Sequence, residues 1–163
     1  MTATSTHDEI ELAKLPVARI QDVLLSRMIV REEAARLGFG PQALTQIATA
    51  VSEIARNVVQ HAGRAGQVRV LKTTIQSRLG LKITVEDDGA GIADIDRALA
   101  GTSPGAGIPG ARKLMDEFTI RSSLGTGTVV NMVKWLPGAG SDAPRPEQQG
   151  WFPAVLHRDD GRL

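Results

Sequence analysis

Hydrophobic positions recur with a helical period in the first half of the chain. In residues 23–37 apolar side chains at positions 24, 25, 28, 29, 34 and 37 follow a helical rhythm, and Gly38 is expected to end this helix. A second helix is predicted to begin at Pro41, a residue favoured in the first helical turn, and to end at Gly63. Its apolar stripe is the most regular in the chain and comprises Leu44, Ile47, Ala48, Val51, Ile54, Ala55 and Val58.

Alternating and β-branched runs predict the strands. Residues 15–20 can form a short strand, which Pro16 would place at a sheet edge. Residues 67–75 and 79–86 alternate between apolar and polar side chains, and their short connection predicts an antiparallel hairpin. A glycine-rich stretch and a short helix that begins at Pro109 follow. The chain then returns to strand, ending with the β-branched run 128–136.

This order of elements predicts an α/β (α+β) two-layer sandwich, with helices on one face of an antiparallel or mixed sheet. The domain is expected to span residues 14–136. Residues 1–13 are polar and are predicted to be a flexible N-terminus. Residues 137–163 are rich in Pro, Gly and Ser and are predicted to be a flexible extension. The apolar run 151–156 within it is interpreted as a segment packed on the domain or a remnant of the chain end.

Composition narrows the possible functions. The 163 residues suit one domain, and 19 basic against 18 acidic side chains provide no basic excess for nucleic acid. Without cysteine there are no disulfides, and three widely separated histidines do not form a zinc site. Neither a membrane-spanning run nor a signal peptide is recognisable, so a cytoplasmic protein that does not bind membranes is expected.

Two polar residues of the second helix could carry chemistry. Glu53 and Asn57 are four positions apart, so they share one helix face, roughly opposite the centre of the apolar stripe. Taken alone, they are polar residues on a solvent-exposed face. Together they are also chemically useful, because a carboxylate can accept a proton and an amide oxygen can coordinate Mg²⁺.

Three glycine motifs follow in the second half of the chain. In the first, Asp87 begins a D-x-G-x-G-I pattern at a strand end, where a carboxylate can accept a hydrogen bond from an exocyclic amine. A tight turn is the simpler explanation. The second motif, GAGIPG at 105–110, opens a helix whose N-terminus could bind phosphate. No strand precedes it and no Gly-Lys-Ser/Thr is present, which excludes Rossmann and Walker motifs. The third motif, GTGT at 125–128, resembles a hairpin turn.

The ordered co-occurrence of the four patterns resembles the GHKL ATPase superfamily, whose Bergerat fold binds ATP. Within it, the segments AVSEIARN, EDDGAGI, GAGIPGARKLMDEFTIRS and GTGTVVNMVKW resemble the anti-sigma regulatory factor serine/threonine kinases. This resemblance covers residues 15–136.

The resemblance implies a role for each residue. Asn57 would hold Mg²⁺ at the ATP phosphates, Glu53 would be the general base, and Asp87 would bind adenine with help from Thr128. Residues 93–108 would be a mobile ATP lid that is shorter than in the family. The full expected ATP-binding set is Asn57, Asp87, Gly89, Gly91, Ile92, Gly105, Ala106, Gly107, Ile108, Gly110 and Thr128.

The implied function is an ATP-dependent serine/threonine-protein kinase of a partner-switching pathway that controls a stress-response sigma factor. It would phosphorylate a STAS-domain protein and, once released, bind a PP2C-type phosphatase. The alternative is an anti-sigma factor that binds a sigma or anti-anti-sigma partner in an ATP-dependent manner. The catalytic domain of a histidine kinase is disfavoured, because no helix hairpin with a phosphoacceptor histidine precedes the domain and the lid lacks phenylalanine.

Overall fold

A computed structural model of the chain describes residues 7–101 and 107–138. The elements in these ranges are β1 His7–Val17, α1 Ile20–Leu37, α2 Pro41–Asn57, the π-helical turn η1 Val58–Ala62, β2 Gly66–Ile75, β3 Arg78–Asp87, α3 Ile95–Ala100, α4 Gly107–Leu114, β4 Glu117–Ser123 and β5 Gly127–Trp135. Their order agrees with the prediction except for α3.

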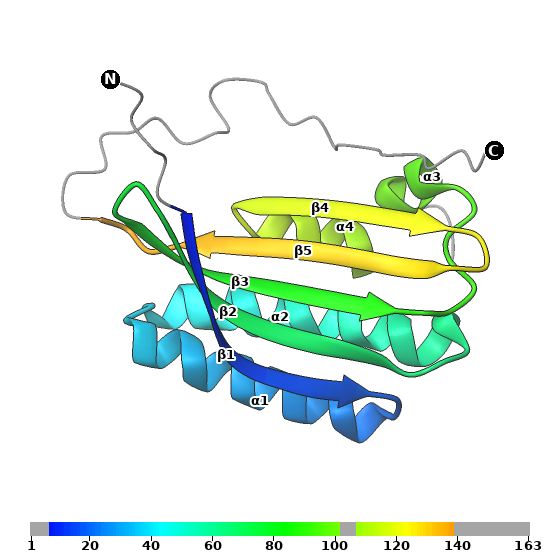
Figure 1. The fold of residues 1–163 in the computed structure, drawn as a ribbon, viewed down its shortest axis with the longest axis horizontal. Helices are drawn as coiled ribbons and strands as arrows, with labels where there is room; N and C mark the ends of the chain where they lie inside the picture. The colour runs from blue at the N-terminus through cyan, green and yellow to red at the C-terminus, as the bar shows by residue number, and fades with distance from the viewer. Residues whose placement is uncertain (1–6, 102–106, 139–163) are drawn as a thin grey trace.

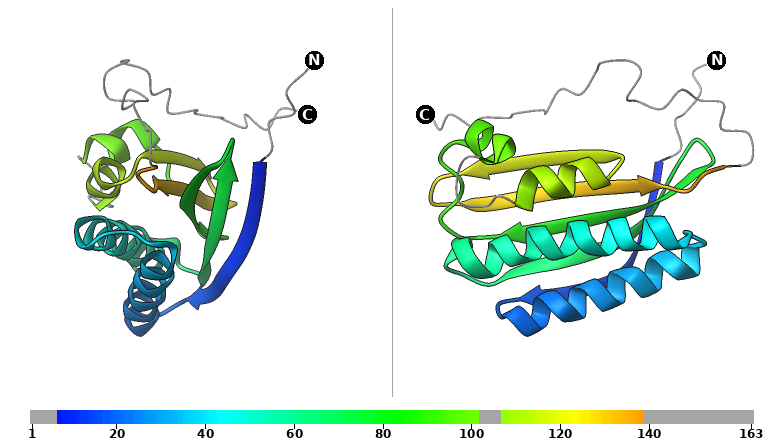
Figure 2. Two further views of the ribbon diagram at one scale, coloured as in Figure 1. Left: turned by 90° about the vertical axis from the view of Figure 1, so that its left-hand side faces the viewer. Right: turned by 180° about the vertical axis from the view of Figure 1, so that it is seen from behind.

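The strands of the described residues form one sheet in the order β1-β2-β3-β5-β4, and all four neighbouring pairs are antiparallel. Helices α1, α2 and α4 cover one face of this sheet, as Figures 1 and 2 show from three sides. The two-layer α/β architecture is therefore confirmed, and the sheet is antiparallel rather than mixed.

The core forms between the helices and the sheet because strand residues alternate between its two faces. Val68 and Val70 of β2 point to the helices and are fully buried, as is Ile83 of β3. They pack in one cluster with the apolar stripe of α2, whose Ile47 and Val51 are also fully buried. The strong periodicity of α2 thus reflects its central place over the sheet (Figure 2).

The first strand begins earlier than predicted. Residues 7–13, expected to be part of a flexible N-terminus, form the first part of β1 and pair with β2. Two long-range ion pairs also hold β1 to the sheet, from Glu11 to Arg69 of β2 at 2.7 Å and from Glu9 to Lys82 of β3 at 2.7 Å. The polar sequence suggested a loose tail, because the partners that stabilise this strand are about 60 or more residues away and leave no mark on the local pattern. As predicted, the strand that contains Pro16 is an edge strand.

Helix α1 also begins earlier than its apolar period suggested. The Asp22 carboxylate accepts the backbone N–H groups of Ala18 and Arg19 at 2.9 and 2.8 Å, which stabilises the start of the helix at Ile20. Gly38 ends α1 in the left-handed conformation, with φ 101°, as the sequence predicted. The predicted second helix consists of α2 and the turn η1, which Gly63 ends.

The predicted lid contains a helix that its sequence pattern did not reveal. Asp94 caps α3 by accepting the N–H of Arg97 at 3.0 Å, and Gly101 ends it in the left-handed conformation. Residues 102–106 of the lid, and residues 139–163 of the predicted extension, lie outside the described residues. Helix α4 then leads directly into β4 at the sheet edge.

Candidate functional site

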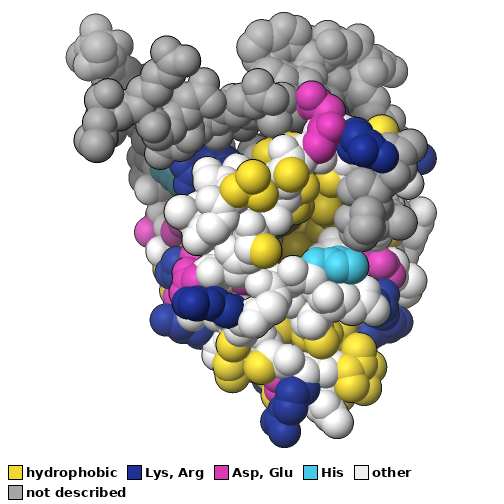
Figure 3. Space-filling view, turned by 90° about the vertical axis from the view of Figure 1, so that its right-hand side faces the viewer, with side chains coloured by type: hydrophobic (Ala, Val, Ile, Leu, Met, Phe, Trp, Pro, Cys, Tyr) yellow, Lys and Arg dark blue, Asp and Glu magenta, His cyan; other side chains and the backbone are white. Residues whose placement is uncertain are grey.

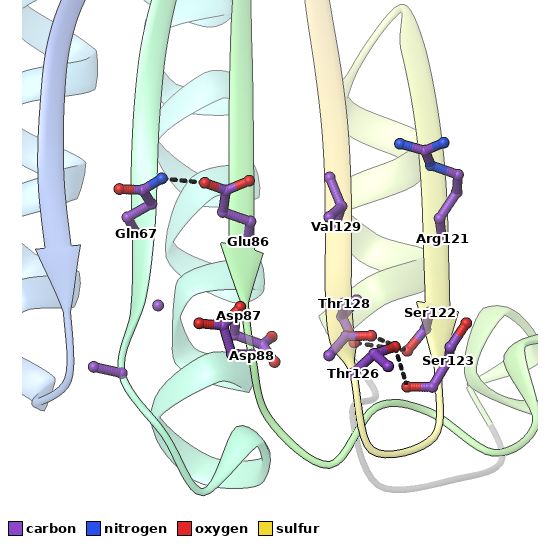
Figure 4. A pocket seen from close by; sticks show the side chains of 13 residues that line it. Gln67, Glu86, Asp87, Asp88, Arg121, Ser122, Ser123, Thr126, Thr128 and Val129 are labelled. Atoms are coloured by element: carbon purple, nitrogen blue, oxygen red, sulfur yellow. Dashed lines mark hydrogen bonds between the residues drawn. The ribbon is translucent and has the colours of Figure 1, made fainter.

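Three polar side chains meet at one end of the sheet. Asp87 ends β3 and is paired with Thr128 of β5, which in turn is paired with Ser122 of β4. Each lies two positions from a buried residue that faces the helices, so all three belong to the helix-covered face. Figure 4 shows them side by side at the ends of their strands.

A cavity of about 60 Å³ lies between Asp87 and Thr128, the end of α2 and the start of α4. Hydrophobic side chains gather around a hollow beside a histidine at this end of the molecule (Figure 3). The cavity therefore combines apolar walls with a few polar groups, which is typical of small-molecule sites. Its lining consists of Ile54, Asn57, Val58, His61, Ala62, Val85, Asp87, Gly91, Ile92, Ile108, Ile120, Thr128 and Val130.

Asn57 faces this cavity, which corrects the expectation of a solvent-exposed face. The helical wheel of α2 places it away from the apolar stripe, but α4 lies on that side of the helix, because Gly107 packs on Glu53 and Ile108 lines the same cavity as Asn57. Its Nδ2 atom is buried and has no hydrogen-bond partner. A buried amide without a partner is costly, so its presence points to a bound group. Rotation of the side-chain amide by 180° exchanges its nitrogen and oxygen, so the amide can present its N–H group to a phosphate or its oxygen to a cation.

Glu53, one turn earlier on α2, is fixed from two sides. Its Oε1 accepts a hydrogen bond from Arg56 Nη1 at 2.8 Å. On its other side, Gly107 at the start of α4 packs so closely that an added Cβ would collide with Oε2. Glu53 does not line the cavity but lies beside it, against Gly107 at the N-terminus of α4.

The glycines after Asp87 allow close packing of backbone on backbone. Asp87 Oδ1 accepts the Gly89 N–H at 2.8 Å, which fixes the start of the loop. A Cβ at Gly89 would collide with the carbonyl of Ala62, and one at Gly91 with that of Ser123. Gly91 also has φ +74°, which side chains rarely adopt. These glycines therefore join the loop to both sides of the cavity.

The structure describes only part of the second glycine motif, residues 105–110. Gly105 and Ala106 lie outside the described residues. Gly110 has nothing within 4 Å of an added Cβ, so its surroundings in the described structure do not require glycine. Ile108, in contrast, is buried and contributes an apolar wall to the cavity.

Two residues of the site were missed at the sequence level. His61 lines the cavity and is four positions after Asn57, a helical spacing that could have revealed it. Ser122 hydrogen-bonds to Thr128 at 2.8 Å and to the N–H of Ile92 at 2.7 Å. Nothing in its local sequence signals this role, because both partners come from distant segments.

A larger hollow, of about 740 Å³, lies across the same strand ends and extends onto the other face of the sheet, and Asp87, Ser122 and Thr128 also line it. Gln67, Glu86, Val129 and Arg121 form a row across it (Figure 4), and Gln67 donates a hydrogen bond to Glu86. Its lining is mostly polar, so it lacks the apolar walls that a nucleotide base requires. The smaller cavity is the candidate site.

The residues present fit magnesium only in part. Among residues 7–101 and 107–138, no three His, Asp or Glu side chains group together to hold a metal ion. Mg²⁺ commonly takes one or two protein ligands and completes its shell with phosphate oxygens and water. The unpaired Asn57 amide suits that arrangement.

The chain belongs to the histidine kinase-like ATPase domain family, whose model matches residues 17–134. The predicted membership of the GHKL superfamily is thereby confirmed. Among curated proteins, the chain is similar to the serine/threonine-protein kinase RsbT of Bacillus subtilis (strain 168), with 42% identity over 120 residues, 71% of this chain and 90% of that protein.

A second relative is the anti-sigma F factor of Thermoanaerobacter sp. (strain X514), 33% identical over 77% of this chain and 92% of that protein. Among solved structures, the RsbU and RsbW domains of Rv1364c from Mycobacterium tuberculosis match with a TM-score of 0.53 and 22% identity. That match covers 82% of this chain and 34% of the longer one, and it supports the fold alone.

No helix within the described ranges is long and apolar enough to cross a bilayer.

Proposed function

We propose that this protein is an ATP-dependent serine/threonine-protein kinase of a partner-switching pathway and that its substrate is a STAS-domain protein. The observation that carries the proposal is the convergence of Asn57, Asp87 and Thr128 on one cavity. The similarity to RsbT over nine-tenths of that kinase supports the same activity.

The base of the nucleotide would bind at the sheet end. Asp87 Oδ1 already accepts the Gly89 N–H, and the second carboxylate oxygen would accept the exocyclic amine of adenine. Thr128, its neighbour on β5, would assist. Ile92 and Ile108 would pack on the faces of the base.

The phosphates would extend from the cavity towards Asn57 and the start of α4. Backbone N–H groups at a helix N-terminus attract phosphate, and α4 begins beside Glu53. Asn57 would hold Mg²⁺, which supplies electrostatic stabilisation of the charge on the transferred phosphoryl group.

Glu53 would act as general base. Its carboxylate takes the proton from the serine or threonine hydroxyl of the partner while that oxygen forms a bond to the γ-phosphorus. The bond from the γ-phosphorus to the β,γ-bridging oxygen breaks, and ADP leaves with that oxygen. Arg56 donates a hydrogen bond to Oε1 and so keeps the carboxylate oriented, which would leave Oε2 to accept the proton.

Nucleotide entry requires a rearrangement. A cavity of about 60 Å³ is far below the roughly 300–1,000 Å³ of typical small-molecule sites. Ile92 and Ile108 would move outward to admit the base; Ile92 lies in the loop after β3 and Ile108 in the first turn of α4. Ile92 precedes and Ile108 ends the proposed lid, residues 93–108, which would open to admit the nucleotide.

Phosphorylation would separate the kinase from its substrate, because the added phosphate places negative charge at the interface. The released kinase would then bind a PP2C-type phosphatase in the cytoplasm. The alternative is an anti-sigma factor that binds its sigma or anti-anti-sigma partner with ATP, and the similarity to an anti-sigma F factor favours it.

Phosphoryl transfer distinguishes the two functions. The full chain is incubated with γ-labelled ATP, Mg²⁺ and a purified STAS-domain protein, and labelled phosphoamino acids are identified. Label on serine or threonine is expected, and Glu53→Gln should reduce it by about a hundredfold or more while nucleotide binding persists. Glu32→Gln, an exposed carboxylate on α1, is the matched control. Stable binding of the STAS protein without label would support the anti-sigma alternative.

A further inference from the structure

We infer that Ser122 determines the base specificity of the site by fixing the hydroxyl of Thr128 as a hydrogen-bond acceptor. In this arrangement Asp87 and Thr128 together select a purine with an exocyclic 6-amino group over one with a 6-oxo group. The inference rests on the proposed function, in which the base lies against Asp87 and Thr128.

Ser122 is at the centre of a small hydrogen-bond network. Its Oγ accepts the N–H of Ile92 at 2.7 Å and donates to the carbonyl of Gly127 at 3.0 Å. It also lies 2.8 Å from Oγ1 of Thr128, where either hydroxyl could donate (Figure 4). Three segments of the site thus meet at one side chain: the loop after β3, the end of β4 and the start of β5.

Counting protons settles the direction of the third bond. A serine hydroxyl has one proton and two lone pairs. The carbonyl of Gly127 can only accept, so it takes the proton of Ser122. The N–H of Ile92 can only donate, so it takes one lone pair. The remaining lone pair can therefore form a bond only if Thr128 donates its proton to Ser122.

This direction determines what Thr128 presents to the cavity. With its proton committed to Ser122, Oγ1 offers only lone pairs to a ligand. Asp87 is an acceptor as well, and both residues line the cavity. Two neighbouring acceptors match the two protons of an amino group, whereas a 6-oxo oxygen would face two acceptors without a proton between them.

Loss of the Ser122 hydroxyl would remove this selection. In Ser122→Ala the Thr128 hydroxyl would be free to rotate and to donate its proton to a 6-oxo oxygen. The variant would also deprive the Ile92 N–H of its partner, which would weaken the binding of any nucleotide to a similar extent. The ratio of two affinities therefore separates base selection from a general loosening of the site.

The test is calorimetric titration of the full chain with ATP and with inosine triphosphate, each with Mg²⁺. Inosine triphosphate replaces the 6-amino group by a 6-oxo group and leaves the ribose and phosphates unchanged. The unchanged chain should prefer ATP, and Ser122→Ala should reduce the ATP-to-inosine-triphosphate affinity ratio by roughly tenfold. Ser122→Thr keeps the hydroxyl and should retain the preference.

Thr126→Ala is the matched control. Its hydroxyl donates to the carbonyl of Ser123 in the same hairpin, at 3.2 Å, and it is exposed. This variant should leave the ratio unchanged. The inference is overturned if Ser122→Ala weakens both nucleotides equally, or if the unchanged chain binds the two with equal affinity. Binding of neither nucleotide to the unchanged chain would refute the proposed function, and this inference with it.

Discussion

At the scale of single residues, the candidate site depends on side chains that serve both the fold and the ligand. Asp87 illustrates this, because one of its carboxylate oxygens accepts a hydrogen bond from the Gly89 N–H and the residue also lines the cavity. Ser122 joins three backbone segments through one hydroxyl. Asn57, by contrast, has a buried amide nitrogen that the protein does not satisfy. Such a group costs stability and is retained where function requires it.

A conservative change at Asp87 should therefore separate binding from folding. In Asp87→Asn the amide oxygen can still accept the Gly89 N–H, so the fold should persist. The other atom becomes a donor that faces the donor amine of adenine. We expect ATP affinity to fall by about tenfold to a hundredfold, measured by calorimetric titration.

Asp88→Asn provides the comparison, because it removes the same charge from the neighbouring exposed position. It should change ATP affinity little. Equal affinity of Asp87→Asn and the unchanged chain would show that the base does not bind at Asp87.

At the scale of elements, the connection between α1 and α2 contains two glycines, Gly38 and Gly40, with different backbone conformations. Gly38 ends α1 with φ 101°, and the N–H of Phe39 returns to the carbonyl of Ala34 at 3.2 Å. Phe39 is buried in the core cluster. Gly40 then precedes α2 with an ordinary φ of −77°. Two glycines two positions apart thus have different physical requirements.

Their alanine variants should differ in stability. Both positions have open space for a Cβ, so only the backbone conformation distinguishes them. Gly38→Ala should lower the free energy of unfolding by about 1 kcal/mol, because alanine is strained in the left-handed region. Gly40→Ala should change the free energy of unfolding little. Alanine is a weaker N-cap residue than glycine, but it also lowers the conformational entropy of the unfolded chain, and the two effects offset each other.

Urea denaturation of the two variants measures this difference. A destabilisation of Gly40→Ala equal to that of Gly38→Ala would contradict the left-handed end of α1.

At the scale of the whole molecule, one sheet face is covered by helices and the other carries a network of charged side chains. On that open face Glu9 of β1 reaches across β2 to Lys82 of β3, at 2.7 Å. The hydrogen bond from Lys82 is the main cause that lowers the pKa of Glu9 below its usual value of 4.5, and the positive charge of Lys82 adds to it. The interaction joins the outer strand to the centre of the sheet.

This pair should give the domain a pH-dependent component of stability. The carboxylate is favoured in the folded state, so its contribution is present above about pH 4.5 and disappears as the pH falls through the lowered pKa of Glu9. Glu9→Gln should cost about 0.2–1 kcal/mol at pH 7, and the difference from the unchanged chain should vanish in acid.

Thermal unfolding between pH 3 and pH 7 measures the effect, with Asp8→Asn as the control on the same strand. A constant difference between Glu9→Gln and the unchanged chain across this range would contradict the assigned ion pair.

The sequence by itself determined the elements whose pattern is local. The period of α2, the alternation of β2 and β3, and the helix end at Gly38 follow from side chains within a few positions of one another. The spacing of Glu53, Asn57 and Asp87, together with the glycine motifs, also sufficed to indicate the family. Each motif consists of residues close together in the chain, and their order along it is part of the sequence, so a linear pattern contains both.

Only the tertiary structure decided the features that depend on distant partners. Residues 7–13 are a strand because β2 pairs with them, and the amide nitrogen of Asn57 is buried on a helix face that looked polar, where Ile108 of α4 lines the same cavity. Ser122 matters because the chain brings Ile92 and Thr128 to its hydroxyl. Long-range pairing and packing create these environments, and a local pattern of residues does not record them.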